Sequence, residues 1–268
     1  MTKKIKYSGA EIFYEEYGEG VPVVLLHGFG ESSRVWHKQI PALQNICKLI
    51  LPDLPGSGRS AMLDIAVTNI SIPDFADCVN SILERENIRQ CIMLGHSMGG
   101  YITLSFAEQY PEKIKAFGLL HSTAFADNEE KKQNRLRGIE LIETYGSYAF
   151  LKNTIPNLFA DSFKTTNAEE IGHLIDDGKQ FSEKSLQQYY YAMMQRRDAT
   201  HVLKNSRVPV LFMIGKEDVA APLNDLLKQV YLPGISYIHI LKNAGHMGMW
   251  EAEKVFNEYI KEFVNEIA

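Results

Sequence analysis

Residues 95–99 read Gly95-His96-Ser97-Met98-Gly99, a Gly-x-Ser-x-Gly pentapeptide. It follows the short apolar run 91–94 and opens a stretch of helical character over residues 98–110. A serine flanked by glycines at a strand-to-helix turn is the pattern of a nucleophile elbow, because glycine permits the sharp turn that exposes the hydroxyl. The pentapeptide also arises by chance in chains of this size. Its meaning therefore depends on the rest of the sequence.

Composition and charge narrow the class of protein. The chain has 268 residues, is 45% hydrophobic and carries a net charge of −5. With no long basic run, neither a nucleic-acid nor an anionic-membrane partner is expected. No apolar stretch approaches the ~20 residues of a membrane span, and we expect no signal peptide. Three cysteines, Cys47, Cys78 and Cys91, stand in apolar patterns, so we expect buried free thiols and a cytoplasmic location.

Strand-like and helix-like segments alternate along most of the chain. This alternation predicts an α/β fold with a mostly parallel central sheet flanked by helices. The predicted strands are residues 11–17, 21–26, 47–51, 91–94, 114–121, 210–214 and 235–241, a helix is expected over 72–87, and one amphipathic helix is expected to close the chain over 247–268.

The alternation breaks between residues 123 and 203. Four helical patterns follow one another there without a strand, at residues 129–144, 147–159, 167–177 and 182–197. Asn167 and Ser182 are suitable N-caps for the last two. We therefore expect an inserted all-helical cap at 123–203 over a core made of residues 1–122 and 204–268.

A nucleophilic serine needs a base, and the base needs an orienting carboxylate. Asp218 follows the predicted strand 210–214, and His246 follows the predicted strand 235–241. Because the carboxyl ends of parallel strands meet at one edge of a sheet, Ser97, Asp218 and His246 are expected to converge there as the catalytic residues. Glu217 is the alternative orienting acid, although it is expected to face the other way.

The loop His27-Gly28-Phe29-Gly30 follows the predicted strand 21–26. Acyl transfer requires backbone N–H donors where the carbonyl oxygen becomes negative. We expect Phe29 to supply one of these oxyanion-hole donors. Met98, directly after the serine and at a helix N-terminus, is expected to supply the other.

These spaced motifs, together with the segments Asp53-Leu54-Pro55-Gly56-Ser57-Gly58-Arg59-Ser60 and Gly245-His246, resemble the α/β-hydrolase fold-1 superfamily. The resemblance covers the chain outside the expected cap. It implies the fold, the Ser-Asp-His order of the triad and a structural turn at residues 53–60. Ser97 stands where haloalkane dehalogenases and epoxide hydrolases carry an aspartate nucleophile, so the resemblance does not extend to their activities.

The substrate pocket is the least defined part of the sequence. Candidate pocket residues are Trp36, His121, Tyr190, Met194 and Trp250, with packing as the alternative for the aromatic strip 189–194. His96 is expected to pack on the far side of the elbow. Arg196 and Arg197 are candidates for binding a substrate carboxylate, or for a solvated helix end.

The sequence as a whole predicts a serine hydrolase that cleaves a carboxylic ester through an acyl-enzyme on Ser97. Its partner is expected to be a small-molecule substrate, an apolar ester or acyl compound. No metal-binding or phosphate-binding motif occurs, so neither a metal nor another cofactor is expected. Carbon–carbon bond hydrolysis, cofactor-free perhydrolysis, and a ligand receptor with a slow triad remain alternatives. The sequence does not define an oligomeric state.

Overall fold

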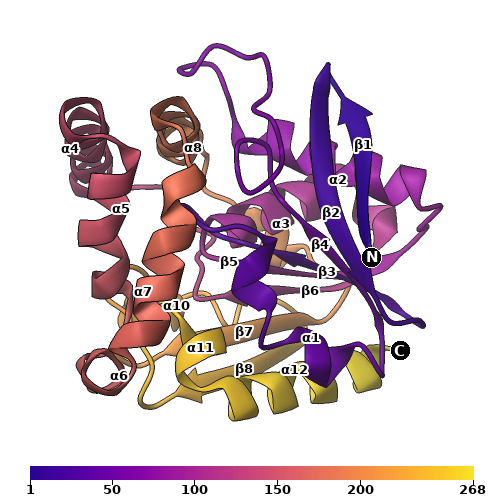
Figure 1. Cartoon of the computed structure of the whole chain (residues 1–268). Coiled ribbons are helices and arrows are strands. Elements are labelled where there is room, and N and C mark those ends of the chain that lie inside the picture. The colour runs from indigo at the N-terminus through magenta and orange to yellow at the C-terminus, as the bar shows by residue number, and fades with distance from the viewer.

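Eight strands form one sheet in the order β1-β2-β4-β3-β5-β6-β7-β8 (Figure 1). The computed structural model describes all 268 residues. From β4 to β8 along this order every neighbouring pair is parallel, whereas β1 and β2 pair antiparallel with each other and β2 with β4. The strands are β1 (Thr2–Tyr7), β2 (Ala10–Tyr17), β3 (Pro22–Leu26), β4 (Lys48–Pro52), β5 (Cys91–His96), β6 (Ile114–Leu120), β7 (Val210–Gly215) and β8 (Ser236–Leu241).

The central strands are buried on both faces, which explains their continuous apolar sequences. All six residues of β5 and all six of β7 are buried. The predicted strands agree with the observed ones to within a few residues, and the mostly parallel α/β sheet is confirmed. Strand β1 was not predicted, because this edge strand alternates lysines and half-buried residues and has no apolar run.

Helices cover both faces of the sheet. On one face α2 (Ile72–Arg85) packs against α3 (Met98–Gln109), and on the other α12 (Glu253–Ile267) lies beside α1 (Ile40–Leu43) (Figure 1). A capping box starts α2, in which the Asp74 carboxylate accepts from the Ser71 amide at 2.8 Å. No helix has the length and apolar character that a membrane span requires.

The prediction of one closing helix over 247–268 is wrong, because two helices occupy this segment. The chain forms a short helix α11 (Gly248–Glu251), leaves helical geometry at Ala252 (φ −128°, ψ 39°) and then enters α12. The Glu251 carboxylate at the end of α11 accepts from the amides of Gly245 (2.9 Å), Met247 (3.1 Å) and Ala160 (2.7 Å). These hydrogen bonds connect the end of α11 to the loop that carries His246 and to Ala160.

A wholly helical segment separates β6 from β7. Helices α4 to α8 gather beside the sheet (Figure 1), with no strand among them. The inserted helical segment is thus confirmed, while its division at residues 122 and 204 stays a prediction. Helix α6 was missed because six residues are too short to show a helical period. The helices are α4 (Glu129–Tyr145), α5 (Ser147–Thr154), α6 (Asp161–Thr166), α7 (Ala168–Asp177), α8 (Glu183–Gln195) and α9 (Thr200–Lys204), and α10 (Leu223–Leu226) follows β7.

Candidate active site

Ser97 occupies the sharp turn between β5 and α3. Its backbone lies at φ 51° and ψ −115°, a conformation that costs energy for a residue with a side chain. The flanking glycines are required by space: a Cβ on Gly95 would lie 2.1 Å from the Gly99 oxygen, and a Cβ on Gly99 would lie 2.4 Å from the Leu26 oxygen. The Gly-x-Ser-x-Gly spacing is therefore explained by close backbone packing around the serine.

Asp218 and His246 meet at the carboxyl ends of β7 and β8. The Asp218 Oδ2 atom lies 2.8 Å from His246 Nδ1, and its Oδ1 accepts from the amides of Ala220 (2.9 Å) and Ala221 (2.8 Å). Burial by itself raises the pKa of Asp218, but the charge of His246 and hydrogen bonds from His121 and His246 outweigh it and lower this pKa. Asp218 is therefore an anion that fixes the His246 ring and leaves Nε2 free.

One cavity of about 190 Å³ brings the serine and the histidine together. Ser97 and His246 both line it, and the Ser97 hydroxyl makes no hydrogen bond within the protein. In enzymes without substrate such hydrogen bonds are often long and tighten only in the complex. The arrangement can therefore support proton transfer from the serine to His246 once a substrate fills the cavity.

The two expected oxyanion-hole donors are available. The amides of Phe29 and Met98 donate to no group in the protein, and the Phe29 side chain lines the same cavity as Ser97. Met98 is the first residue of α3, where the helix dipole favours negative charge. Whether these amides bind an oxyanion stays a prediction.

The sequence of this chain is similar to those of known proteins. Residues 21–134 match the family model of the alpha/beta hydrolase fold. The chain is 26% identical over 264 residues to a 2-hydroxy-6-oxononadienedioate/2-hydroxy-6-oxononatrienedioate hydrolase of Burkholderia vietnamiensis, covering 94% of this chain and 90% of the relative. The chain belongs to the α/β-hydrolase superfamily.

Solved structures agree with this assignment of the fold. A thermophilic esterase from Thermogutta terrifontis, with malate bound, superposes with a TM-score of 0.92 at 24% identity, covering 100% of this chain and 99% of the esterase. An enol-lactonase from Burkholderia xenovorans LB400 gives a TM-score of 0.90 at 19% identity, covering 98% and 100% of the two chains. Both structures therefore show that this chain has the α/β-hydrolase fold.

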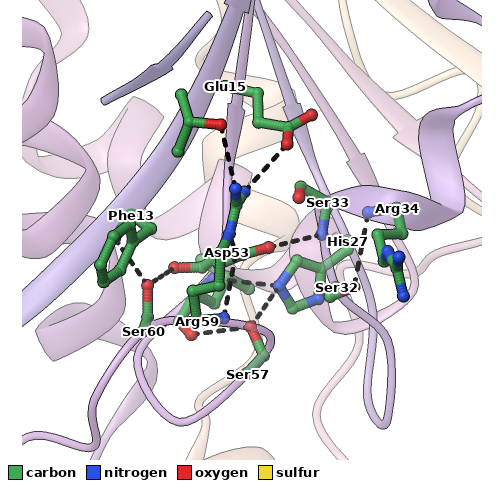
Figure 2. Close-up of polar contacts among 12 residues, drawn as sticks. Phe13, Glu15, His27, Ser32, Ser33, Arg34, Asp53, Ser57, Arg59 and Ser60 are labelled. Atoms are coloured by element: carbon green, nitrogen blue, oxygen red, sulfur yellow. Dashed lines mark hydrogen bonds and ion pairs between the residues drawn. The ribbon is translucent and has the colours of Figure 1, made fainter. Parts of the chain in front are cut away.

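A buried polar network holds the loop 27–30, which is named the oxyanion loop below after the role predicted for Phe29 (Figure 2). The His27 Nε2 atom accepts from the Leu54 amide at 3.0 Å and lies 2.8 Å from Ser57 Oγ, while Nδ1 lies 2.9 Å from the Gly28 oxygen. The ring is completely buried, which lowers its pKa and keeps it neutral. His27 thereby ties the loop 27–30 to the turn 53–60.

Asp53 anchors that turn from the other side (Figure 2). Its carboxylate accepts from the Ser33 amide (2.9 Å), from the Arg59 amide (3.1 Å) and from Arg59 Nε (3.1 Å). A Cβ on Gly58 would lie 2.5 Å from the Asp53 carboxyl carbon, so glycine is required where the chain curls around it at φ 52°. This matches the structural role expected of residues 53–60.

Most of the residues predicted to line the pocket do not line the cavity that contains Ser97. Tyr190 lines the cavity, but Met194 does not, because the preceding residue, Met193, occupies that face of α8. Trp36 is fully buried with its ring plane perpendicular to that of His96, and Trp250 donates from Nε1 to the Val35 oxygen at 2.9 Å. Both tryptophans therefore belong to the core and not to the pocket.

His121 lies behind the acid and does not line the cavity. Its Nδ1 atom is 3.3 Å from Asp218 Oδ2, so the carboxylate oxygen is shared with His246. Burial lowers the pKa of His121 to about 4, and its Nε2 atom has no partner. His121 is therefore a neutral ring that donates to Asp218.

The atoms of His121, Asp218 and His246 that could bind a metal ion lie within 4.8 Å of one another. The hydrogen bonds from both histidines to Asp218 account for this spacing.

Sequence reasoning missed four residues of the cavity wall that carry polar groups. Glu31, Thr154 and Arg135 line the cavity, and so does the largely apolar side chain of Tyr101. No motif marks them, since Glu31 follows the oxyanion loop while Arg135 lies in α4, whose placement depends on the tertiary fold. His96 is completely buried, so the prediction that it packs holds, but its ring also lies within hydrogen-bonding distance of Glu31 and of the backbone oxygen of His246.

Proposed function

We propose that this α/β-hydrolase is a serine hydrolase that cleaves a carboxylic ester through an acyl-enzyme on Ser97. The observation that carries the proposal is the 2.8 Å contact between His246 Nδ1 and Asp218 Oδ2, with His246 lining the same cavity as Ser97. A serine on a strained turn, a base and a buried anion are the three parts that nucleophilic catalysis needs. The family membership supports hydrolysis, and the site supports serine as the nucleophile.

The proposed reaction has two halves. The Ser97 oxygen attacks the acyl carbon while His246 takes its proton, and the negative oxygen that forms is bound by the amides of Phe29 and Met98. His246 then gives the proton to the leaving alcohol oxygen as the ester C–O bond breaks. Water attacks the acyl-enzyme with His246 again as base, releasing the carboxylic acid and the free serine.

The cavity supports a small substrate with an apolar body. Nine of its 14 lining residues are hydrophobic, among them Leu151, Ile155 and Leu158. At about 190 Å³ it is smaller than the roughly 300–1,000 Å³ of sites for drug-sized ligands.

We also propose a cytoplasmic location. The three cysteines are buried and free, which supports this location.

Carbon–carbon bond hydrolysis is the second candidate, favoured by the similarity to a hydrolase named for 2-hydroxy-6-oxononadienedioate. The same serine, histidine and aspartate could act there. Parallel assays on simple methyl esters and on a 2-hydroxy-6-oxodienoate, with products identified by mass spectrometry, distinguish the two reactions.

Labelling with a fluorophosphonate tests the proposal, since only an activated serine is phosphonylated quickly. We expect rapid labelling of Ser97 and turnover of short-chain methyl esters by the wild type. Ser97→Ala should remove labelling and lower turnover by about 10⁶, as in comparable enzymes. Slow labelling would favour a ligand receptor, and ester turnover retained in purified Ser97→Ala would exclude this nucleophile.

A further inference from the structure

We propose that the cavity is built for acyl substrates that carry a carboxylate, which forms an ion pair with Arg135 of α4. The inference rests on the proposed function, because it takes Ser97 as the reacting residue of the same cavity. It names the substrate class that the apolar walls alone do not define.

Arg135 is half-buried and has a hydrogen-bonding group to spare. Its side chain is 18% exposed and lines the cavity together with Ser97 and His246. Its Nε donates to Asp127 Oδ2 at 2.6 Å and its Nη2 to Asp127 Oδ1 at 3.3 Å. Nη1 donates to nothing in the protein and is not among the fully buried unpartnered atoms, so it is open to a ligand.

The charges around Arg135 do not cancel. The fully buried carboxylate of Asp127 also accepts from Arg196 Nη2 at 2.9 Å, so two guanidinium groups share one anion. Arg196 also donates to the backbone oxygens of Met193 (2.7 Å) and Phe125 (3.0 Å), and it does not line the cavity. One positive charge is therefore left in excess, and only Arg135 presents it to the cavity.

The other charge at the cavity wall is already compensated. Glu31 accepts from the Gly28 amide at 2.7 Å and lies 3.0 Å from His96 Nδ1. It therefore does not neutralise Arg135. An anionic group on the substrate would be the partner of the excess charge.

An aromatic stack holds the guanidinium in place. Arg135 lies over the ring of Tyr190 at 5.5 Å, and Tyr190 stacks on Phe29 with ring centroids 4.3 Å apart and nearly parallel planes. A planar guanidinium held on a ring and against a carboxylate loses little further freedom on binding a second carboxylate. The stack also connects Arg135 to the oxyanion loop, so the carboxylate would bind within the same cavity as the reacting carbonyl.

The test compares esters matched in size. Monomethyl esters of succinate, glutarate and adipate are each paired with the methyl keto ester in which a methyl ketone replaces the carboxylate. We expect the wild type to prefer the carboxylate ester of one length by kcat/KM. In Arg135→Gln this preference should fall about 10- to 100-fold, the value of a charge-assisted hydrogen bond. Arg135→Lys, which keeps the charge beside Asp127, should be intermediate.

Arg137→Gln is the matched control, because Arg137 is an exposed arginine of the same helix whose side chain hydrogen-bonds only to Asn134. It removes the same charge and should leave the preference unaltered. If keto esters are cleaved and Ser97 is labelled, but the preference is absent or survives Arg135→Gln, the carboxylate subsite is refuted and the proposed function stands.

A binding measurement keeps the two proposals separate. If no ester is cleaved and Ser97 is not labelled, the proposed function fails, and the subsite is judged by thermal unfolding in the presence of glutarate. Stabilisation of the wild type and of Arg137→Gln, lost in Arg135→Gln, supports the subsite. If glutarate stabilises the wild type and Arg135→Gln equally, or stabilises neither, the carboxylate subsite is refuted.

Discussion

Glu31 and His96 form a buried ion pair beneath the candidate nucleophile. The Nδ1 atom of His96 lies 3.0 Å from Glu31 Oε2, and its Nε2 atom lies 2.9 Å from the backbone oxygen of His246. Both neighbours are acceptors, so the ring satisfies both only as an imidazolium. Burial lowers the pKa of His96, but the charge of Glu31 and its hydrogen bond outweigh this and raise that pKa. The pair connects the oxyanion loop, through the Gly28 amide, to the backbone of His246.

We expect Glu31→Gln to impair both stability and turnover. It leaves the imidazolium of His96 buried without its anion, so the free energy of unfolding should fall by about 3 kcal/mol. Small shifts of the loops carrying Phe29 and His246 should lower kcat/KM by up to ~10²-fold. Urea unfolding and ester kinetics measure the two effects.

The double variant Glu31→Gln/His96→Gln is the control, because it leaves no unpaired charge. It should recover part of the stability lost in the single variant. A single variant as stable as the wild type would show that the two side chains are not an ion pair.

The sequence predicted what depends on local pattern. The Gly-x-Ser-x-Gly turn, the apolar strands and the loops after β7 and β8 carry their information in neighbouring residues, so the sheet and the positions of Asp218 and His246 followed from them. The residues that form the cavity wall could not be predicted from such local patterns. Which face of α8 presents Met193, and how α4 brings Arg135 to the cavity, depend on helix packing between segments far apart in the chain.

Asp218→Asn should slow ester turnover by about 10⁴-fold, because the asparagine amide favours the wrong tautomer of His246. Glu217→Gln is the matched control, since Glu217 is exposed and its carboxylate forms no hydrogen bond or ion pair with another side chain. It should have little effect on steady-state kinetics. If Glu217→Gln were the more damaging change, Asp218 would not be the orienting acid.

His121 should make stability depend on pH. Burial lowers its pKa from an ordinary 6.5 to about 4, so between these values the unfolded chain binds more protons than the folded one. Its contribution is full above pH 6.5 and is lost as the pH falls toward 4, amounting to ~2 kcal/mol between pH 7.5 and 5.

His121→Asn removes this titration while keeping a donor toward Asp218, and asparagine tolerates the φ of 51° at this position. In urea unfolding at pH 7.5 and 5, the difference between the two free energies should shrink by that ~2 kcal/mol in the variant. An unchanged difference would mean that the pKa of His121 is the same in the folded and the unfolded protein.

The wall of the cavity formed by α8 should set the preferred acyl length. Tyr190 and Met193 line the cavity, whereas Met194 is the next residue on the same helix and does not. Removing bulk at Tyr190→Ala or Met193→Ala enlarges the cavity, and each methylene-sized change is worth only ~1–3 kcal/mol. We therefore expect longer acyl chains to gain kcat/KM by about 10-fold or more relative to acetate in both variants. Met194→Ala, the control, should keep the wild-type profile. The measurement is kcat/KM across a series of p-nitrophenyl esters, with circular dichroism to verify folding. If Met194→Ala shifted the profile and the other two variants did not, α8 would present a different face to the substrate than the one that contacts this cavity.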